Sequence, residues 1–220
     1  LEPAIGGGIG VAPREFAQVQ AAYAVGSMLM IAMQQWLSRH FGYRHYLLVA
    51  LLREWHNAIL PCEVWLVASS SEEVGLRGGQ TAARVVAPDV AFVLDTACWA
   101  KNFDYSVANH RQLGKGPMLV LSDKSLIAPP KLTAWVESVA ADAGISLQLD
   151  MFSNGGTDGG AVHVSGTGIP TVVMGPATRY GHCAASIADC RDIIQTQQLL
   201  SALLSHLTCE TVAHLTDFRC

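Results

Sequence analysis

The sequence predicts an α/β protein in which a mixed β-sheet is flanked by helices. Short apolar runs alternate with longer stretches of helical periodicity along most of the chain, and that alternation is typical of a sheet covered by helices. The composition, 50% hydrophobic and 15% charged, provides for a large core. A length of 220 residues corresponds to one domain, or to one domain with a small appendage.

The first third of the chain contains two expected helices, over residues 19–37 and 45–55. Asn57 and Pro61 end the second of them. A GGGIG stretch at 6–10 resembles a phosphate-binding loop, but it lacks a preceding strand and the full GxGxxG spacing. A nucleotide-binding protein is therefore only a minor alternative.

The rest of the chain predicts five strands and three helices. Strands are expected over residues 64–68, 91–94, 118–121, 147–152 and 171–174, where apolar runs are bounded by turn residues. Helices are expected over 79–86, 129–143 and 189–208. The helix at 129–143 begins with two prolines and is followed by Gly144, and the closing helix has apolar residues along one face.

Charge, hydropathy and cysteine usage exclude several classes of partner. A net charge of −4 and a pI of about 6.0 argue against nucleic acid, which needs a basic surface. Spanning a membrane takes about 18 apolar residues, and the longest such run, residues 21–33, fits a buried helix instead. The six cysteines form no CxxC pair and no signal-peptide pattern is present. We therefore expect reduced thiols and a cytoplasmic protein.

Paired carboxylates follow the expected strand at 64–68, in the sequence EVWLVASSSEEVGLRGG at 63–79. Glu72 and Glu73 would lie at the carboxyl end of that strand, and Asp95 ends the next one. Ligands bind at this edge in open α/β sheets. Neighbouring carboxylates repel unless a cation or a proton lies between them. The hypothesis is that Glu73 binds a metal ion and Glu72 acts as a general base. A solvated acidic loop is the alternative.

Two further stretches supply polar groups after apolar runs. His182 lies on a loop beyond the strand at 171–174, and a glycine-dense turn, SNGGTDGG, spans 153–160. Asp158 in this turn is either a turn-forming residue or a substrate contact. Carboxylates and imidazole suit zinc, cobalt or manganese. Two such ions would activate a water for hydrolysis while a nearby glutamate takes its proton. The sequence has neither a GxSxG nor an HExxH motif.

Taken together, these stretches resemble the di-metal aminopeptidases, the family of glutamyl and tetrahedral aminopeptidases that includes proteins called endoglucanase M. The resemblance spans roughly residues 46–219. It rests on SSSEEVGLRGG at 69–79, VLDTA at 93–97, SNGGTDGGAVH at 153–163 and GIPTVVMGPATRYGH at 168–182. It implies a zinc-peptidase-like α/β/α fold, removal of N-terminal residues from peptides, two divalent metal ions (zinc, cobalt or manganese) and a homo-oligomer.

The resemblance also implies a role for individual residues. Glu72 resembles the catalytic base. Glu73 and His182 resemble ligands of one metal, and Asp95 resembles a ligand of the other. The glycine-dense turn adds the substrate-contact candidates Gly156, Thr157 and Asp158.

The N-terminal part departs from the family pattern. Residues 1–45 contain no counterpart of the family's histidine ligand, and FGYR at 41–44 has no carboxylate where the family has a metal-bridging aspartate. The family's small inserted β domain is also missing. We therefore expect a divergent segment at 1–45, a catalytic-type domain at 46–220, and a truncated or misread version of the enzyme. Weak metal binding and impaired aminopeptidase activity follow from the missing ligands. The alternative is an inactive relative that acts as a binding or assembly module.

Overall fold

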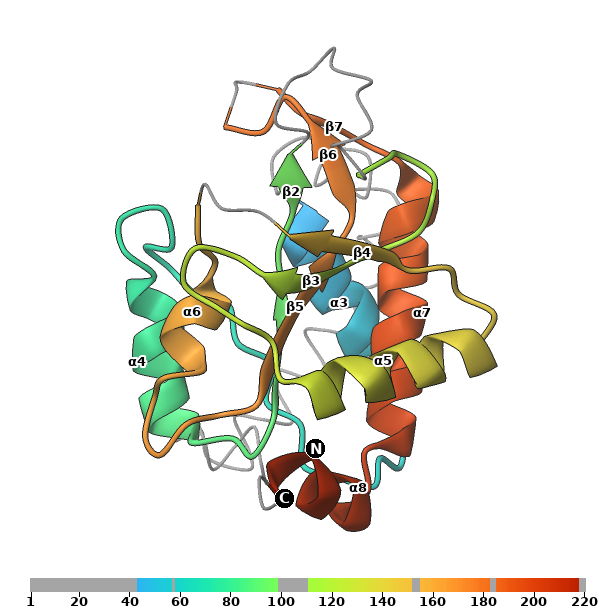
Figure 1. Ribbon diagram of the computed structural model, residues 1–220. Coiled ribbons are helices and arrows are strands. Elements are labelled where there is room, and N and C mark those ends of the chain that lie inside the picture. Colours follow the sequence, from blue (N-terminus) through green and yellow to red (C-terminus); the bar gives the residue numbers. More distant parts are fainter. Residues whose placement is uncertain (1–42, 57, 99–110, 152–154, 183–184, 218–220) are drawn as a thin grey trace, which may run out of the picture. The chain divides into compact units, whose positions relative to one another are not determined.

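The computed structural model describes residues 43–56, 58–98, 111–151, 155–182 and 185–217 (Figure 1). The chain divides into two compact units, Leu1–Val67 and Ala68–Cys220. In the first unit, helix α3 (Tyr43–Trp55) confirms the helix predicted at 45–55. The helix expected at 19–37 and the GGGIG stretch lie outside the described residues. None of the described helices is long and apolar enough to cross a membrane.

The second unit is built on a mixed four-stranded sheet, as predicted. Its strand order is β1-β5-β3-β4. β1 is parallel to β5, β5 is antiparallel to β3, and β3 is parallel to β4. The strands are β1 (Ala91–Leu94), β3 (Met118–Ser122), β4 (Gln148–Met151) and β5 (Thr171–Gly175). The first and last residues of each strand agree with those of a predicted strand to within one residue. The predicted end of the strand at 147–152, Phe152, lies outside the described residues.

A second, three-stranded sheet of order β2-β6-β7 extends the first. It consists of β2 (Ala97–Cys98), β6 (Ala177–Arg179) and β7 (Ile187–Ala188). β2 follows β1 along the chain and β6 follows β5, so the same two segments pair in parallel in both sheets. Between the sheets the two segments come very close: a Cβ on Gly175 would lie 1.8 Å from the carbonyl oxygen of Asp95. Only glycine fits at that position.

Helices cover both faces of the four-stranded sheet, which confirms the predicted α/β/α layering (Figure 1). Helices α4 (Arg77–Val86) and α6 (Asp158–Val162) lie on one face. Helices α5 (Pro130–Asp142) and α7 (Cys190–His206) lie on the other, and α8 (Cys209–Thr216) follows α7.

Strand β1 shows how alternate side chains are shared between the two helical layers. Val93 packs against the cluster that contains Ala83 of α4 and Val162 of α6. The neighbouring Phe92 instead lies 6.4 Å, between ring centroids, from Trp135 of α5. Successive residues of a strand point to opposite faces of a sheet, so helices partly cover the apolar run at 91–94 from both sides.

Three expectations need correction. The strand predicted at 64–68 is wrong, because residues 64–68 are not in a strand and Trp65 and Val67 are 41% and 44% exposed. A strand needs a hydrogen-bonded partner, which an apolar run alone does not supply. The turn predicted at 153–160 becomes α6 at Asp158. The closing helix ends two residues early, and α8 follows it.

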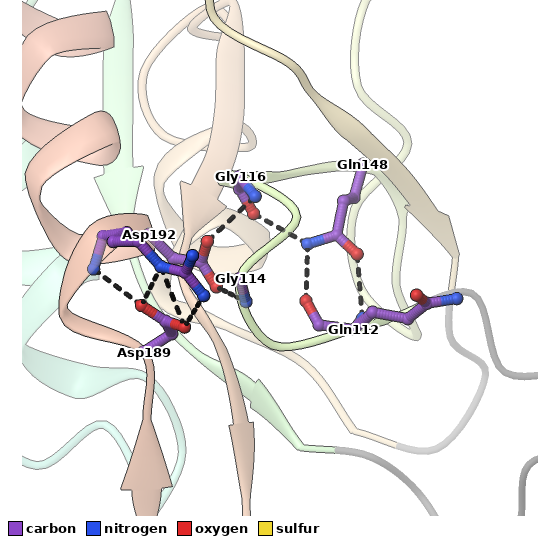
Figure 2. Close-up of polar contacts among 7 residues, drawn as sticks. Gln112, Gly114, Gly116, Gln148, Asp189 and Asp192 are labelled. Carbon is purple, nitrogen blue, oxygen red and sulfur yellow. Dashed lines mark hydrogen bonds and ion pairs between the residues drawn. The ribbon is translucent and has the colours of Figure 1, made fainter.

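The loop before β3 is fixed by two side chains from other elements (Figure 2). Asp192 of α7, which is fully buried, accepts hydrogen bonds from Gly114 N (2.7 Å) and Gly116 N (2.8 Å). Gln148 of β4 bonds both backbone groups of Gln112, through its Oε1 (2.8 Å) and its Nε2 (2.9 Å). The start of β3 is thereby tied to both β4 and α7.

Candidate metal and catalytic site

The paired glutamates lie on a loop whose backbone is held by the residues that begin α4. We call residues 69–73 the carboxylate loop. Each of three successive carbonyl groups in it accepts a hydrogen bond from an N–H further along the chain: Ser70 O from Gly78 N (2.9 Å), Ser71 O from Arg77 N (3.3 Å) and Glu72 O from Leu76 N (2.9 Å). A second bond to Glu72 O comes from Gly75 N, at 3.1 Å. The path of the backbone up to Glu73 is therefore closely defined.

Left-handed backbone conformations occur in this loop region and in the loop that carries His182. Ser71 and Leu76 have φ values of 60° and 56°, and Tyr180 and His182 have values of 59° and 58°. Residues with a side chain adopt this region at a cost, and they keep it only where surrounding contacts determine the conformation. Such strain is concentrated at functional sites.

These two loops bring Glu73 and His182 together, although the residues are far apart in the sequence. His182 Nε2 lies 3.1 Å from Glu73 Oε1, and the side chains are 81% and 68% exposed. Two atoms bound to one tetrahedral ion at about 2.0–2.1 Å lie about 3.3 Å apart. The separation of the two side chains is thus close to that of two ligands of one ion.

Asp95 lies directly after β1, at the carboxyl end that the sequence predicted. Its N–H continues the pairing with β5 by donating to Met174 O (3.0 Å), and its Oδ1 accepts from Thr96 N (2.7 Å). The side chain is 8% exposed. Asp95 belongs to a more buried layer than the solvent-exposed pair of Glu73 and His182.

The described residues do not make a complete metal site. Nowhere among them do three His, Cys, Asp or Glu side chains gather closely enough to hold a metal ion. A catalytic zinc normally has three protein ligands. The pair of Glu73 and His182 fits part of such a site, and the described residues do not bring Asp95 into a three-ligand group with that pair. Glu72, the candidate base, is half-buried beside the exposed Glu73.

The substrate-contact candidates pack against neighbouring loops. Thr157 is 3% exposed, and its Oγ1 donates to Asp123 Oδ2 (3.0 Å). Asp158 is 7% exposed, and its Oδ2 accepts from Ser69 Oγ (2.5 Å). Gly156 is half-buried. Their role in substrate binding stays a prediction.

Sequence reasoning missed the contact between Ser69 and Asp158. These residues lie 89 positions apart in the sequence, so no local pattern connects them. The one available signal was a polar residue directly after the apolar run at 64–68.

The chain is similar to known aminopeptidases over most of its length. A family model described as M42 glutamyl aminopeptidase matches residues 17–199. The protein named putative aminopeptidase FrvX, of Escherichia coli (strain K12), is 39% identical over 158 residues, which cover 70% of this chain and 43% of FrvX. The chain therefore belongs to the M42 family, whose members depend on divalent metal ions in general.

Solved structures of this kind share the fold. The TET aminopeptidase from the marine sediment archaeon Thaumarchaeota archaeon SCGC AB-539-E09 superposes with a TM-score of 0.74 at 36% identity, over 78% of this chain and 49% of that chain. PhTET1-12s, a dodecamer in the asymmetric unit, gives a TM-score of 0.65 at 26% identity, over 74% and 47%. The chain thus spans about half of the length of the relatives it matches.

Proposed function

We propose that this chain is a metal-dependent aminopeptidase, which removes N-terminal residues from peptides, in an impaired form. The observation that carries the proposal is the contact between Glu73 and His182 at 3.1 Å, made by two strained loops in a chain of the M42 family. In this proposal Glu73 and His182 bind one divalent ion, either zinc, cobalt or manganese, and Asp95 binds a second. Such ions supply Lewis-acid activation when they are bound.

Glu72 has the role of general base. Its half-buried carboxylate accepts a proton from the attacking water and later returns it to the leaving amine. The exposed Glu73 binds the metal ion instead, so the two neighbouring glutamates have different roles in this proposal.

The impairment follows from the ligand count. The described residues bring together two ligands where a catalytic zinc normally has three. Metal binding by this chain should therefore be weak and turnover slow. The second candidate function, an inactive relative that acts as a binding or assembly module, is favoured by the same shortage of ligands.

Release of a chromogenic amine from an aminoacyl substrate, with added cobalt, tests the proposal. We expect slow release that stops with a chelator and with Glu72→Gln. Release that continues unchanged in both cases would contradict the assigned chemistry. No release from a chain with a normal circular dichroism spectrum would favour the inactive module.

We also propose that the chain consists of a divergent segment, residues 1–45, followed in the sequence by a catalytic-type domain, residues 46–220, and that it forms homo-oligomers in the cytoplasm. The dodecamer of PhTET1-12s supports the oligomer. Cys190 and Cys209 are free thiols, which suits a reducing compartment. Light scattering after gel filtration tests the oligomer: a monomer across the micromolar range would contradict it.

A further inference from the structure

Asp158 is a buried carboxylate that the proposed chemistry does not use. Its side chain is 7% exposed, and its Oδ2 accepts a hydrogen bond from Ser69 Oγ at 2.5 Å. Its other oxygen, Oδ1, is buried and has no hydrogen-bond partner in the described part of the chain. A buried carboxylate with one free oxygen is unfavourable by itself. The hydrogen bond from Ser69 is therefore the contact that accounts for a buried carboxylate at this position.

Ser69 is the first residue of the carboxylate loop. The next three residues are held through their carbonyl groups by N–H groups from Gly75 to Gly78, and Glu73 follows directly. Asp158 thus fixes the start of the loop, whereas the beginning of α4 fixes the rest. Without the Ser69 contact, the loop is anchored from one side only.

Two adjacent glycines allow α4 to approach both partners. A Cβ on Gly78 would lie 2.2 Å from Ser70 O, and a Cβ on Gly79 would lie 2.7 Å from Asp158 Cγ. Any larger residue at either position would push the helix away from the loop or from Asp158. The start of α4 is therefore packed between the carboxylate loop and Asp158.

We propose that Asp158 is a positioning residue, which holds the carboxylate loop through Ser69 so that Glu73 reaches His182. Its effect on metal binding rests on the proposed function, whereas its effect on the loop does not. This role is an alternative to the predicted substrate contact. A carboxylate that is more than nine-tenths buried and bonded to Ser69 reaches substrate only if the loop moves.

Amide hydrogen exchange in the full chain tests the loop directly. Removing a charge-assisted hydrogen bond should open the loop locally, so Ser69→Ala and Asp158→Ala should speed exchange at the N–H groups of Leu76 and Gly78 about tenfold. Ser69→Thr and Asp158→Asn keep a donor and an acceptor, and they should stay within about threefold of wild type. If Asp158→Ala does not fold, Ser69→Ala alone still tests whether the hydrogen bond between Ser69 and Asp158 holds the carboxylate loop.

Asp192→Ala is the matched control, because Asp192 is also a buried aspartate that anchors a loop by hydrogen bonds. It should lower global stability while leaving exchange at Leu76 and Gly78 unchanged relative to global unfolding. Unchanged exchange in Ser69→Ala and Asp158→Ala would overturn the proposal. An equal increase in Asp192→Ala would also overturn it, because the effect would then be general.

Zinc titration separates this inference from the proposed function. Ser69→Ala should weaken zinc binding about tenfold, Ser69→Thr should restore it, and Asp192→Ala should leave it unchanged. Loss of loop protection with unchanged zinc affinity would overturn the link to Glu73. If the wild-type chain binds none of zinc, cobalt and manganese, the proposed function fails, and hydrogen exchange alone decides whether Asp158 positions the loop.

Discussion

Replacing Asp192 by alanine should destabilise the second unit more than any ordinary surface substitution. The carboxylate is fully buried and accepts two backbone hydrogen bonds, from Gly114 N (2.7 Å) and Gly116 N (2.8 Å) (Figure 2). A hydrogen bond to a charged group contributes about 1.5–3 kcal/mol. The Gly116 bond is buried and the Gly114 bond is partly exposed, so water can replace only the second. The expected loss is therefore about 3–4 kcal/mol in the free energy of unfolding.

Urea denaturation followed by circular dichroism measures this loss. With a slope of about 2 kcal/mol per molar urea, the midpoint should fall by about 1.5–2 M. Asp142→Ala is the control, because Asp142 is exposed near the end of α5 and its replacement should change stability by less than about 0.5 kcal/mol. An Asp192→Ala midpoint within about 0.3 M of wild type would refute the reasoning, since it would show that this loop does not depend on the carboxylate.

Two further predictions concern the strand junction and the start of α7. Gly175→Ala places a Cβ 1.8 Å from Asp95 O and should lower stability by about 3 kcal/mol. In the control variant Gly166→Ala, the added Cβ meets no atom within 4 Å, and the free energy of unfolding should fall by only about 1 kcal/mol, because the backbone there is left-handed. Equal urea midpoints for the two variants would contradict the close approach of Gly175 to Asp95. The hydrogen bond from Arg191 lowers the pKa of Asp189 from 3.8 to about 2. Because the pKa of Asp189 is lower in the folded than in the unfolded state, its ionised carboxylate stabilises the fold at pH values above the unfolded-state pKa. This stabilisation is lost as the pH falls through the folded-state pKa. The stability difference between wild type and Asp189→Asn should therefore be constant above about pH 4 and should shrink towards pH 2; a difference that does not vary with pH would contradict the pairing.

Patterns that depend on neighbouring residues in the sequence predicted most of the second unit. The runs at 91–94 and 171–174 are strands because both of their faces are covered by helices, so continuous apolar character was a sufficient signal. The helix α5 begins after Pro129 and ends before Gly144, as the two punctuating residues indicated.

Features that depend on distant partners were not predictable. The run at 64–68 is apolar like the others, yet it is not a strand, and its local pattern does not distinguish it from the runs that are. Helix α6 has five residues, two of them glycine, so it shows no helical periodicity. The contact between Ser69 and Asp158 is likewise set by packing.

In the candidate site, too, features set by the local sequence were predictable and features set by distant partners were not. Glu73 and His182 lie 3.1 Å apart, on loops whose left-handed residues no sequence pattern indicated, and their role as metal ligands stays a prediction. Asp95 occupies the expected strand end but is buried. Its role as a ligand of a second metal ion stays a prediction.

Zinc titration by calorimetry, on the full chain and on Glu73→Gln and His182→Ala, tests most directly whether these two side chains hold a metal. We expect weak zinc binding, with a Kd above about 1 µM. Two protein ligands contribute less binding free energy than the three ligands of an ordinary catalytic zinc. That binding should be lost in both variants. Two tight sites in the wild-type chain, or binding that both variants retain, would contradict the assignment.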